Sequence, residues 1–311
     1  MLKHYLSVAD LSHDEAIALL ERAAILKEEW HIGVDQTSHL RGQTLALVFE
    51  KPSLRTRVAF EAGMTQFGGH ANYLSANDID MGGRESVADV ARNLSRWVQC
   101  IAARVFRHQT VTELARHATI PVINALSDIE HPCQALADML TLHEHYSDLH
   151  ECRLAYVGDG NNVCNSLMLL GATLGMTVIV ACPPDYRPHP DMLAQAEHLA
   201  NEYEGTIAVT SVPEEAVEGA DAVYTDVWAS MGQEHEAARR RPVFEPYQVN
   251  AHLLSRANPE ALVMHCLPAH RGEEITADVI DGPQSVVFEQ AENRLHVQKA
   301  LIVQLLEAGH L

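Results

Sequence analysis

Residues 44–67 read TLALVFEKPSLRTRVAFEAGMTQF, in which a short apolar run is followed by a longer segment with helical spacing. A continuous apolar run bounded by turn residues is typical of a strand that is covered on both faces of its sheet. Such a strand, followed directly by a helix, is the repeating unit of parallel α/β structure. The same alternation continues toward both ends of the chain.

Further β-rich runs alternate with helical patterns on either side of this stretch. In the first half they are ANYLS (71–75), CIAARV (100–105) and VINAL (122–126). In the second half they are RLAYVG (153–158), TVIVAC (177–182), TIAVTS (206–211), AVYTDV (222–227), LVMHCL (262–267) and SVVFEQ (285–290). The pattern predicts an α/β protein with two similar domains, each a parallel sheet flanked by helices.

Two long helical patterns mark how the predicted domains connect. Residues 132–146 form a linker helix followed by the polar stretch 147–151, which puts the domain boundary near residue 147. The last helical pattern, 291–311, has no strand after it and is expected to return to the first domain. The predicted domains are therefore residues 1–147 with this C-terminal helix, and residues 148–290.

Two other segments give local predictions. Ser12 and Glu15 have the spacing of a capping box, which predicts that the first helix starts there. Residues 228–249 lack clear periodicity, and the interpretation is a long irregular loop of the kind that is usually functional or mobile.

Composition narrows the class of partner. Among 311 residues there are 42 acidic and 22 basic side chains, giving a formal charge of -20. Such a surface is poorly suited to nucleic acid or to anionic membranes, so we expect neither as a partner.

The six cysteines form no C-x-x-C pair and the first residues resemble no targeting segment, which predicts a cytoplasmic protein. The histidines lack metal-site spacing, so no metal is predicted.

The turn between the first strand and its helix has the composition of an anion site. Ser53 can cap the helix and leave the backbone N–H groups of Leu54, Arg55 and Thr56 at the positive end of its dipole. The hydroxyls of Ser53 and Thr56 and the guanidinium groups of Arg55 and Arg57 are expected to converge there, which favours phosphate. The alternative is an ordinary helix start with solvated arginines.

Four more polar segments follow predicted strands, at the edge where open α/β sheets bind ligands. They are His131-Pro-Cys-Gln134, Gly158-Asp-Gly-Asn-Asn162, Asp226 with the segment to Gly232, and His265-Cys-Leu-Pro268. Taken alone, the segment at His131 is also compatible with a helix cap that carries an incidental histidine, and Cys266 with a small buried side chain. The glycines at 158 and 160 do not complete G-x-G-x-x-G, so a nucleotide-dependent oxidoreductase is a poor alternative.

Together, and in this order, the five segments resemble the aspartate and ornithine carbamoyltransferase family over nearly the whole chain. S-x-R-T-R with H-P-x-Q is similar to the family's carbamoyl phosphate signature. D-x-x-x-S-M-G (226–232), H-C-L-P (265–268) and F-E-Q-A-E-N-R (288–294) resemble the ornithine branch.

The resemblance implies a reaction and an assembly. The reaction is transfer of a carbamoyl group from carbamoyl phosphate to the δ-amine of L-ornithine, giving citrulline and phosphate, with no cofactor. The assembly is a homotrimer or a multiple of trimers. The alternatives are a carbamoyltransferase for putrescine or acetylornithine, and a non-catalytic relative that binds carbamoyl phosphate.

The resemblance also implies roles for individual residues. The carbamoyl phosphate residues would be Ser53, Leu54, Arg55, Thr56, Arg104, His131, Gln134, Cys266, Leu267 and Arg294, of which Arg55, Arg104, His131 and Cys266 would be catalytic. The ornithine residues would be Asn162, Asp226, Ser230 and Met231. The loop 77–86 would reach the active site of a neighbouring subunit. Because Asp80 in this loop would repel phosphate, Arg84 is the candidate for the residue that enters the neighbouring site. Closure of 226–232 and 265–268 onto 53–57 and 131–134 would exclude water.

Overall fold

The structure is a computed structural model that describes residues 2–79, 81–229, 232 and 234–308. The chain divides into two compact units, residues 1–140 with 292–311, and residues 141–291. Each unit contains one parallel sheet flanked by helices, so the predicted fold class is confirmed.

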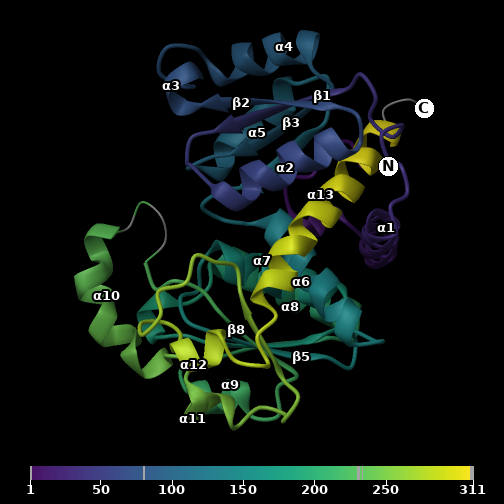
Figure 1. Cartoon of the computed structure of the whole chain (residues 1–311). Coiled ribbons are helices and arrows are strands. Elements are labelled where there is room, and N and C mark those ends of the chain that lie inside the picture. Colours follow the sequence, from purple (N-terminus) through teal and green to yellow (C-terminus); the bar gives the residue numbers. More distant parts are fainter. Residues whose placement is uncertain (1, 80, 230–231, 233, 309–311) are drawn as a thin grey trace. The chain divides into compact units, whose positions relative to one another are not determined.

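The sheet of the first unit has four parallel strands in the order β2-β1-β3-β4 (Figure 1). The strands are β1 (Thr44–Phe49), β2 (His70–Ser75), β3 (Cys100–Arg104) and β4 (Val122–Leu126). Helices α4 (Val87–Trp97) and α5 (His108–His117) pack on one face, against β1 and β3 side chains such as Ala46, Val48 and Ala103. From β1 the chain crosses to β2 through helix α2 (Leu54–Gln66), whereas α4 and α5 lead across the sheet in the opposite direction, to β3 and β4. Because such crossovers are right-handed, α2 lies on the other face of the sheet.

The sheet of the second unit has five parallel strands in the order β7-β6-β5-β8-β9. They are β5 (Arg153–Val157), β6 (Thr177–Ala181), β7 (Thr206–Thr210), β8 (Ala222–Thr225) and β9 (Leu262–His265). Its helices are α7 (Asn162–Thr173), α8 (Pro190–Glu202), α9 (Pro213–Val217), α11 (Ala251–Leu254) and α12 (Ala277–Ile280). Side chains from β5, β8, β9, α9, α11 and α12 form a buried apolar core on one side of the sheet.

Both sheets reverse their strand order beside the strand that comes first in the chain. In the first unit this point lies between β1 and β3, and in the second between β5 and β8. The turns at the carboxyl ends of two such neighbours lead away to opposite faces, which leaves a crevice where ligands bind in folds of this class. Three of the polar segments singled out in the sequence follow strands at these points, after β1, β5 and β8, and the segments at His131 and His265 follow β4 and β9.

Two helices run from one unit into the other: α6 (Pro132–His145) and α13 (Val287–Ala308). The division at residues 140 and 141 falls inside α6, a few residues before the predicted boundary at 147. The prediction for 285–290 was wrong, because only Ser285 forms an isolated bridge, with Val263, and α13 starts two residues later. Gln290 N–H already donates to Val286 O at 2.9 Å, so the apolar residues here form the first helical turn instead of a strand.

The expectation of an irregular loop over 228–249 was also wrong for much of its length. The segment contains the 3₁₀ turns η3 (Glu234–Glu236) and η4 (Glu245–Tyr247) and the helix α10 (Ala237–Phe244). The helix has no apolar period because two side chains anchor it: Phe244, which packs on Tyr186 with ring centroids 4.8 Å apart, and buried Arg240. The remaining short elements are η1 (Val8–Asp10), α3 (Ala76–Ile79) and η2 (Pro184–Tyr186).

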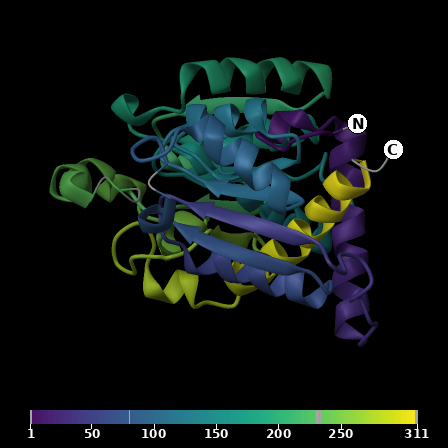
Figure 2. The same cartoon turned by 90° about the horizontal axis from the view of Figure 1, so that it is seen from above.

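Helix α1 (His13–His31) lies beside the part of α13 that belongs to the first unit (Figures 1 and 2). The predicted capping box is confirmed, since Ser12 Oγ accepts from Glu15 N–H at 3.3 Å and Glu15 Oε2 accepts from Ser12 N–H at 3.0 Å. Arg22 of α1 pairs with Glu307 of α13 at 2.8 and 2.9 Å. These contacts fix the returning helix onto α1.

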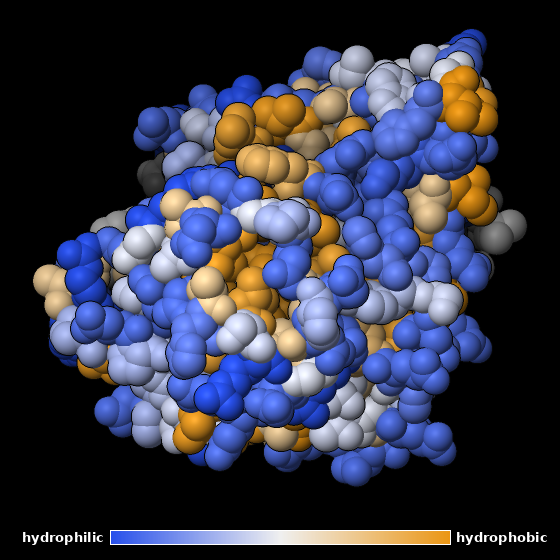
Figure 3. All heavy atoms as spheres, turned by 60° about the horizontal axis from the view of Figure 1, so that its bottom comes forward, coloured by the Kyte–Doolittle hydropathy of each residue, from blue (hydrophilic) through white to orange (hydrophobic). Residues whose placement is uncertain are grey.

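Hydrophilic side chains cover most of the face shown in Figure 3, with apolar side chains gathered in separate patches. Among the helices that the structure describes, none combines the length and the apolar character needed to cross a membrane.

Candidate active site

The first cluster lies at the carboxyl edge of the first sheet, where β1 leads into α2. Ser53 is the N-cap of α2, as predicted: its Oγ accepts from Thr56 N–H at 3.2 Å, and the two hydroxyl oxygens are 3.1 Å apart. Thr56 is fully buried and Leu54 is 73% exposed. One serine therefore caps the helix, and the backbone N–H groups of the first turn form the positive end of the helix dipole.

Arg294 ties this helix start to the start of α6. Its Nη2 donates to Thr56 Oγ1 at 2.7 Å and its Nη1 donates to Gln134 Oε1 at 3.1 Å. Gln134 in turn donates from Nε2 to Asp138 Oδ1 at 2.8 Å. Arg294 is only 2% exposed, and this buried cation brings together two other predicted site residues, Thr56 and Gln134, from distant parts of the sequence.

His131 lies in the same electropositive environment. Burial holds the pKa of His131 well below its usual range, and the charges of Arg294, Arg104 and Arg55 lower this pKa further. The imidazole is therefore neutral near pH 7 and can donate one hydrogen bond from its protonated nitrogen. Arg104, the last residue of β3, is also buried. The first unit thus gathers Arg55, Arg104, His131 and Arg294 at one strand edge.

One predicted member of the anion site lies elsewhere. Arg57 donates from Nε to Glu61 Oε1 at 3.0 Å, and its guanidinium carbon stands 3.8 Å from the centroid of the Tyr73 ring. A partner one helical turn along and an aromatic face beside it direct this arginine away from the helix start. The expected convergence of two guanidinium groups was wrong for Arg57.

The second cluster lies at the carboxyl edge of the second sheet and is centred on Asp226, directly after β8. This carboxylate is 6% exposed. It accepts from Asn161 Nδ2 at 2.7 Å, from the Cys266 thiol at 3.0 Å and from the N–H of Val227 at 2.8 Å. An ionised carboxylate offers about four acceptor positions. Asp226 can therefore take a further hydrogen bond from a cationic ligand.

Asn161 was missed by the sequence analysis, which chose the adjacent Asn162. Asn161 is the N-cap of α7, and its Oδ1 accepts from the N–H groups of Val163 and Cys164 at 2.9 and 3.1 Å. Its amide nitrogen is then directed to Asp226, while Asn162 is the first residue of the helix. The capping preference of asparagine ahead of an apolar helical pattern was the signal that could have identified it.

A buried ion pair anchors the chain that follows Asp226. Arg240 of α10 donates from Nη1 to Asp159 Oδ2 at 2.7 Å and to the carbonyl oxygen of Trp228 at 2.8 Å. Burial raises the pKa of Asp159 to about 6, although Arg240 acts in the opposite direction. The pair joins the turn after β5 to Trp228 and to α10.

The turn that carries Cys266 is held by a second buried pair. His265 Nε2 lies 3.1 Å from Glu274 Oε1, and both side chains are fully buried. His265 Nδ1 accepts from Leu267 N–H at 2.8 Å. Glu274 was not predicted, because nothing in its local sequence distinguishes it from a surface glutamate. Asp226, His265 and Cys266 also have ligand atoms close enough for a metal ion.

Four residues singled out in the sequence either lie outside the described part of the chain or remain at the surface. Ser230, Met231 and Asp80 lie outside the described residues. Arg84 is exposed in the turn between Met81 and Glu85, which form an isolated bridge.

Comparisons with known proteins match each half of the chain to a described family domain. The family described as aspartate/ornithine carbamoyltransferase, carbamoyl-P binding domain, matches residues 3–144, and the Asp/Orn binding domain matches residues 150–305. The ornithine carbamoyltransferase of Methanothermobacter thermautotrophicus is 55% identical over 301 residues, covering 97% of this chain and 98% of the relative. That of Anoxybacillus flavithermus is 53% identical over 304 residues, covering 98% and 96%.

The fold agrees equally well with a solved structure. The ornithine carbamoyltransferase from Pyrococcus furiosus superimposes with a TM-score of 0.96 at 50% identity, covering 98% of this chain and 97% of that chain. On the two family matches and the identities over the full length, this chain belongs to the aspartate/ornithine carbamoyltransferase family.

Proposed function

We propose that this protein transfers the carbamoyl group of carbamoyl phosphate to the δ-amine of L-ornithine, producing citrulline and phosphate. The observation that carries the proposal is the chemical difference between the two clusters. One is built around buried arginines and a neutral histidine, and the other around a buried carboxylate beside a thiol. A dianionic acyl phosphate matches the first, and a cationic amino acid matches the second.

In the first cluster, carbamoyl phosphate would bind by its phosphate at the start of α2. Ser53, the backbone of Leu54, Arg55 and Thr56 would hold the phosphate oxygens, since a helix N-terminus and guanidinium groups both favour them. Arg104 and His131 would donate to the carbamoyl oxygen. Gln134 would contact the carbamoyl amide, and Arg294 would hold Thr56 and Gln134 in place by the bonds described above.

In the second cluster, ornithine would bind by its amino-acid end. Asp226 would pair with the α-ammonium, and Asn162, Ser230 and Met231 would complete the contacts. Cys266 would lie beside the δ-amine, and the backbone at Leu267 would bind the carbamoyl amide. The bond from Asn161 to Asp226 supports this assignment, because it fixes the orientation of the carboxylate before the ligand arrives.

The reaction follows from the charges. An alkylammonium with a pKa of about 10 must lose its proton before it can attack, and nearby arginines favour the neutral amine. The amine nitrogen then bonds to the carbamoyl carbon while negative charge develops on the carbamoyl oxygen, where Arg104 and His131 stabilise it. The bond to the phosphate oxygen breaks, the nitrogen passes its extra proton to the departing phosphate, and phosphate leaves. In the reacting complex, both clusters must act on the same pair of substrates.

We extend the proposal to the assembly and its compartment. A homotrimer, or a multiple of trimers, is supported by large apolar side chains exposed on the first unit, among them Trp97, which is 69% exposed, and Leu54. Arg84, on its exposed turn, is the residue we assign to the active site of a neighbouring subunit. A cytoplasmic location is supported by the six free cysteine thiols, which suit a reducing compartment.

Phosphate release is the test of substrate choice. Purified protein would be mixed with carbamoyl phosphate and, in separate reactions, with L-ornithine, acetylornithine, putrescine or aspartate. The proposal predicts rapid release with L-ornithine and release near the uncatalysed rate with the other three. A higher rate with putrescine or acetylornithine would assign the protein to that amine, and background rates throughout would favour a non-catalytic relative.

A further inference from the structure

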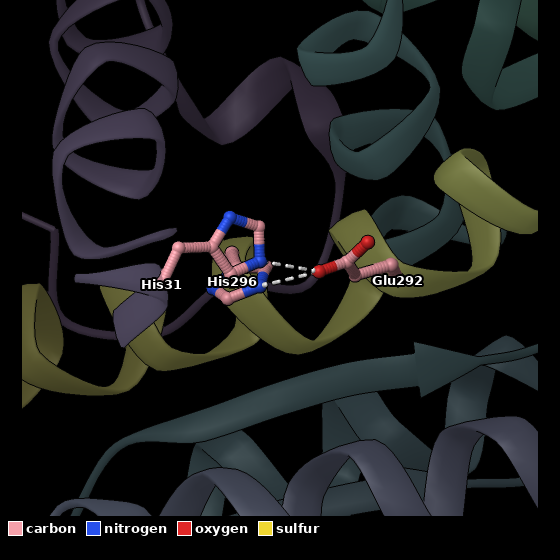
Figure 4. A group of neighbouring side chains, drawn as sticks. All are labelled: His31, Glu292 and His296. Atoms are coloured by element: carbon pink, nitrogen blue, oxygen red, sulfur yellow. Dashed lines mark hydrogen bonds and ion pairs between the residues drawn. The ribbon is translucent and has the colours of Figure 1, made fainter. Parts of the chain in front are cut away.

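A second group of chemically competent side chains lies in the first unit, away from the residues assigned to the reaction. It consists of His31 at the end of α1 and Glu292 and His296, which are one turn apart on α13. Figure 4 shows the two imidazole rings and the carboxylate directed toward one another. Glu292 Oε1 is 2.9 Å from His31 Nε2 and 3.7 Å from His296 Nε2.

The three side chains differ in exposure. His296 is fully buried, whereas the side chains of His31 and Glu292 are 48% and 42% exposed. Neither ring nitrogen of His296 has a hydrogen-bond partner among the described residues. A buried imidazole without hydrogen bonds carries a desolvation cost, which a ligand bound to one of its nitrogens would offset.

We propose that His31, Glu292 and His296 form a binding site for a divalent transition-metal cation of the Zn²⁺ class. Two imidazole nitrogens and one carboxylate oxygen are ligands that Zn²⁺ takes readily, while Ca²⁺ and Mg²⁺ prefer oxygen alone. Tetrahedral coordination with bonds of roughly 2.1 Å puts ligand atoms about 3.4 Å apart. The two separations above bracket this value, and all three ligand atoms lie within 4.8 Å of one another.

Small movements of the two exposed side chains would complete the geometry. The buried ring of His296 is fixed by its surroundings, and His31 and Glu292 can turn toward it from the solvent side. Their exposure leaves the fourth position open to water, as at many zinc sites with three protein ligands. A cation bound here would join α1 to α13 and hold the returning helix on the first unit.

Two lysines lie nearby and act against cation binding. Burial, and after it the charges of Lys299 and Lys27, lower the pKa of His296 to about 4, so the ring is neutral near pH 7. Both ammonium groups have other partners: Lys27 donates to Asn293 Oδ1 at 2.8 Å, and Lys299 donates to Gln36 and Gln66 at 2.5 and 3.0 Å. We therefore expect binding weaker than at a closed structural zinc site, and readily reversible.

The test measures metal binding and not enzyme activity, so its outcome does not depend on the proposed reaction. Two other groups could also take Zn²⁺: Asp226, His265 and Cys266 through the thiol, and His270, Glu273 and Glu274. The reference protein, called Cys266→Ser below, therefore carries Cys266→Ser together with His270→Ala. Zn²⁺ would be titrated calorimetrically into this protein, and Co²⁺ would be followed by its visible absorption. We expect one ion per chain and a higher melting temperature in the presence of Zn²⁺.

Variants of the two exposed ligands locate the ion. Adding His31→Ala or Glu292→Ala to Cys266→Ser should weaken binding by at least about tenfold and remove the effect of Zn²⁺ on melting. The matched control is His145→Ala, since His145 and Glu289 form another exposed histidine–glutamate pair, at 3.0 Å. It should leave the affinity unchanged.

The same data can overturn the proposal. No binding to Cys266→Ser at micromolar Zn²⁺ would do so, and so would an affinity that survives both His31→Ala and Glu292→Ala. His296→Gln is a further variant, but His296 is buried and the substitution disturbs packing. The result for the variants of His31 and Glu292 therefore decides whether the proposal stands. A melting curve without metal establishes that each variant folds.

Discussion

His131 shows how the environment of one side chain sets its chemistry. Three arginines and burial oppose a positive charge on this ring, and its pKa is well below 6.5. Because the folded-state pKa is lowered, the unfolded chain binds the extra proton first. This residue's contribution to stability is therefore present above about pH 6.5 and is lost as the pH falls below that value.

The first prediction is that His131 stays neutral in the native enzyme over the range in which free histidines titrate. In a proton–carbon NMR titration from pH 8 to pH 5.5, the ring signals assigned to His131 by comparison with His131→Gln should not shift. The same titration of the urea-unfolded protein, in which all histidines are exposed to solvent, should show a midpoint near 6.5 and serves as the control. A midpoint near 6.5 for His131 would mean that the arginine cluster does not surround it.

Arg55 and Arg57 stand two positions apart in one motif but have different surroundings: the charge of Arg55 acts on His131, whereas Arg57 pairs with Glu61. We predict that Arg55→Ala lowers kcat/KM roughly 100-fold or more, since loss of one preorganised donor to developing charge typically has this effect. Arg57→Ala, which removes an exposed pair with Glu61, should stay within about tenfold of the unaltered enzyme. Steady-state kinetics with the folded variants measures both effects. Equal losses of kcat/KM in the two variants would reject the assignment of Arg55 to the active site.

At the scale of the element, comparison of two serine caps in the same unit separates helix capping from the phosphate binding proposed for Ser53. Ser53 and Ser12 each accept from a backbone N–H three residues ahead. Ser53→Ala and Ser12→Ala should each lower the free energy of unfolding by about 1 kcal/mol in urea titrations. Only Ser53→Ala should weaken binding of a phosphonate analogue of carbamoyl phosphate, by roughly ten- to hundredfold. Equal affinities in the two variants would count against phosphate binding at this helix.

The elements also show what the sequence could and could not predict. The strands over 44–49 and 153–157 and the helix start at Ser12 were predictable, because apolar runs and capping boxes are local signals. The run 285–290 was misread because a short apolar run fits the first turn of a buried helix as well as a strand.

The candidate site divides in the same way. Ser53, His131 and Asp226 follow strands and could be identified from that position. The pair of Arg240 with Asp159 joins residues 81 positions apart, and the pair of His265 with Glu274 depends on a turn whose shape no local pattern encodes. Such partners become visible only when the chain has folded, because charge complementarity between distant residues leaves no periodic trace in the sequence.

At the scale of the whole molecule, the proposed trimer makes the active site a property of more than one chain. If Arg84 acts in a neighbouring subunit, Arg55→Ala and Arg84→Ala chains should each have little activity. Mixed trimers reassembled from both should recover part of it, because some sites then combine an intact Arg55 with an intact Arg84. Sedimentation analysis gives the assembly size. A monomer, or no recovery from two inactive variants, would contradict the assignment of Arg84.

The central claim is that the chain moves a carbamoyl group onto the δ-nitrogen of ornithine. The most direct measurement supplies carbamoyl phosphate labelled with carbon-13 together with L-ornithine and follows the carbon by NMR and mass spectrometry. We predict that the label appears in the ureido carbon of citrulline, one molecule for each phosphate released, and that Asp226→Asn greatly slows this transfer. Phosphate released without labelled citrulline, or label found on the α-nitrogen, would contradict the account.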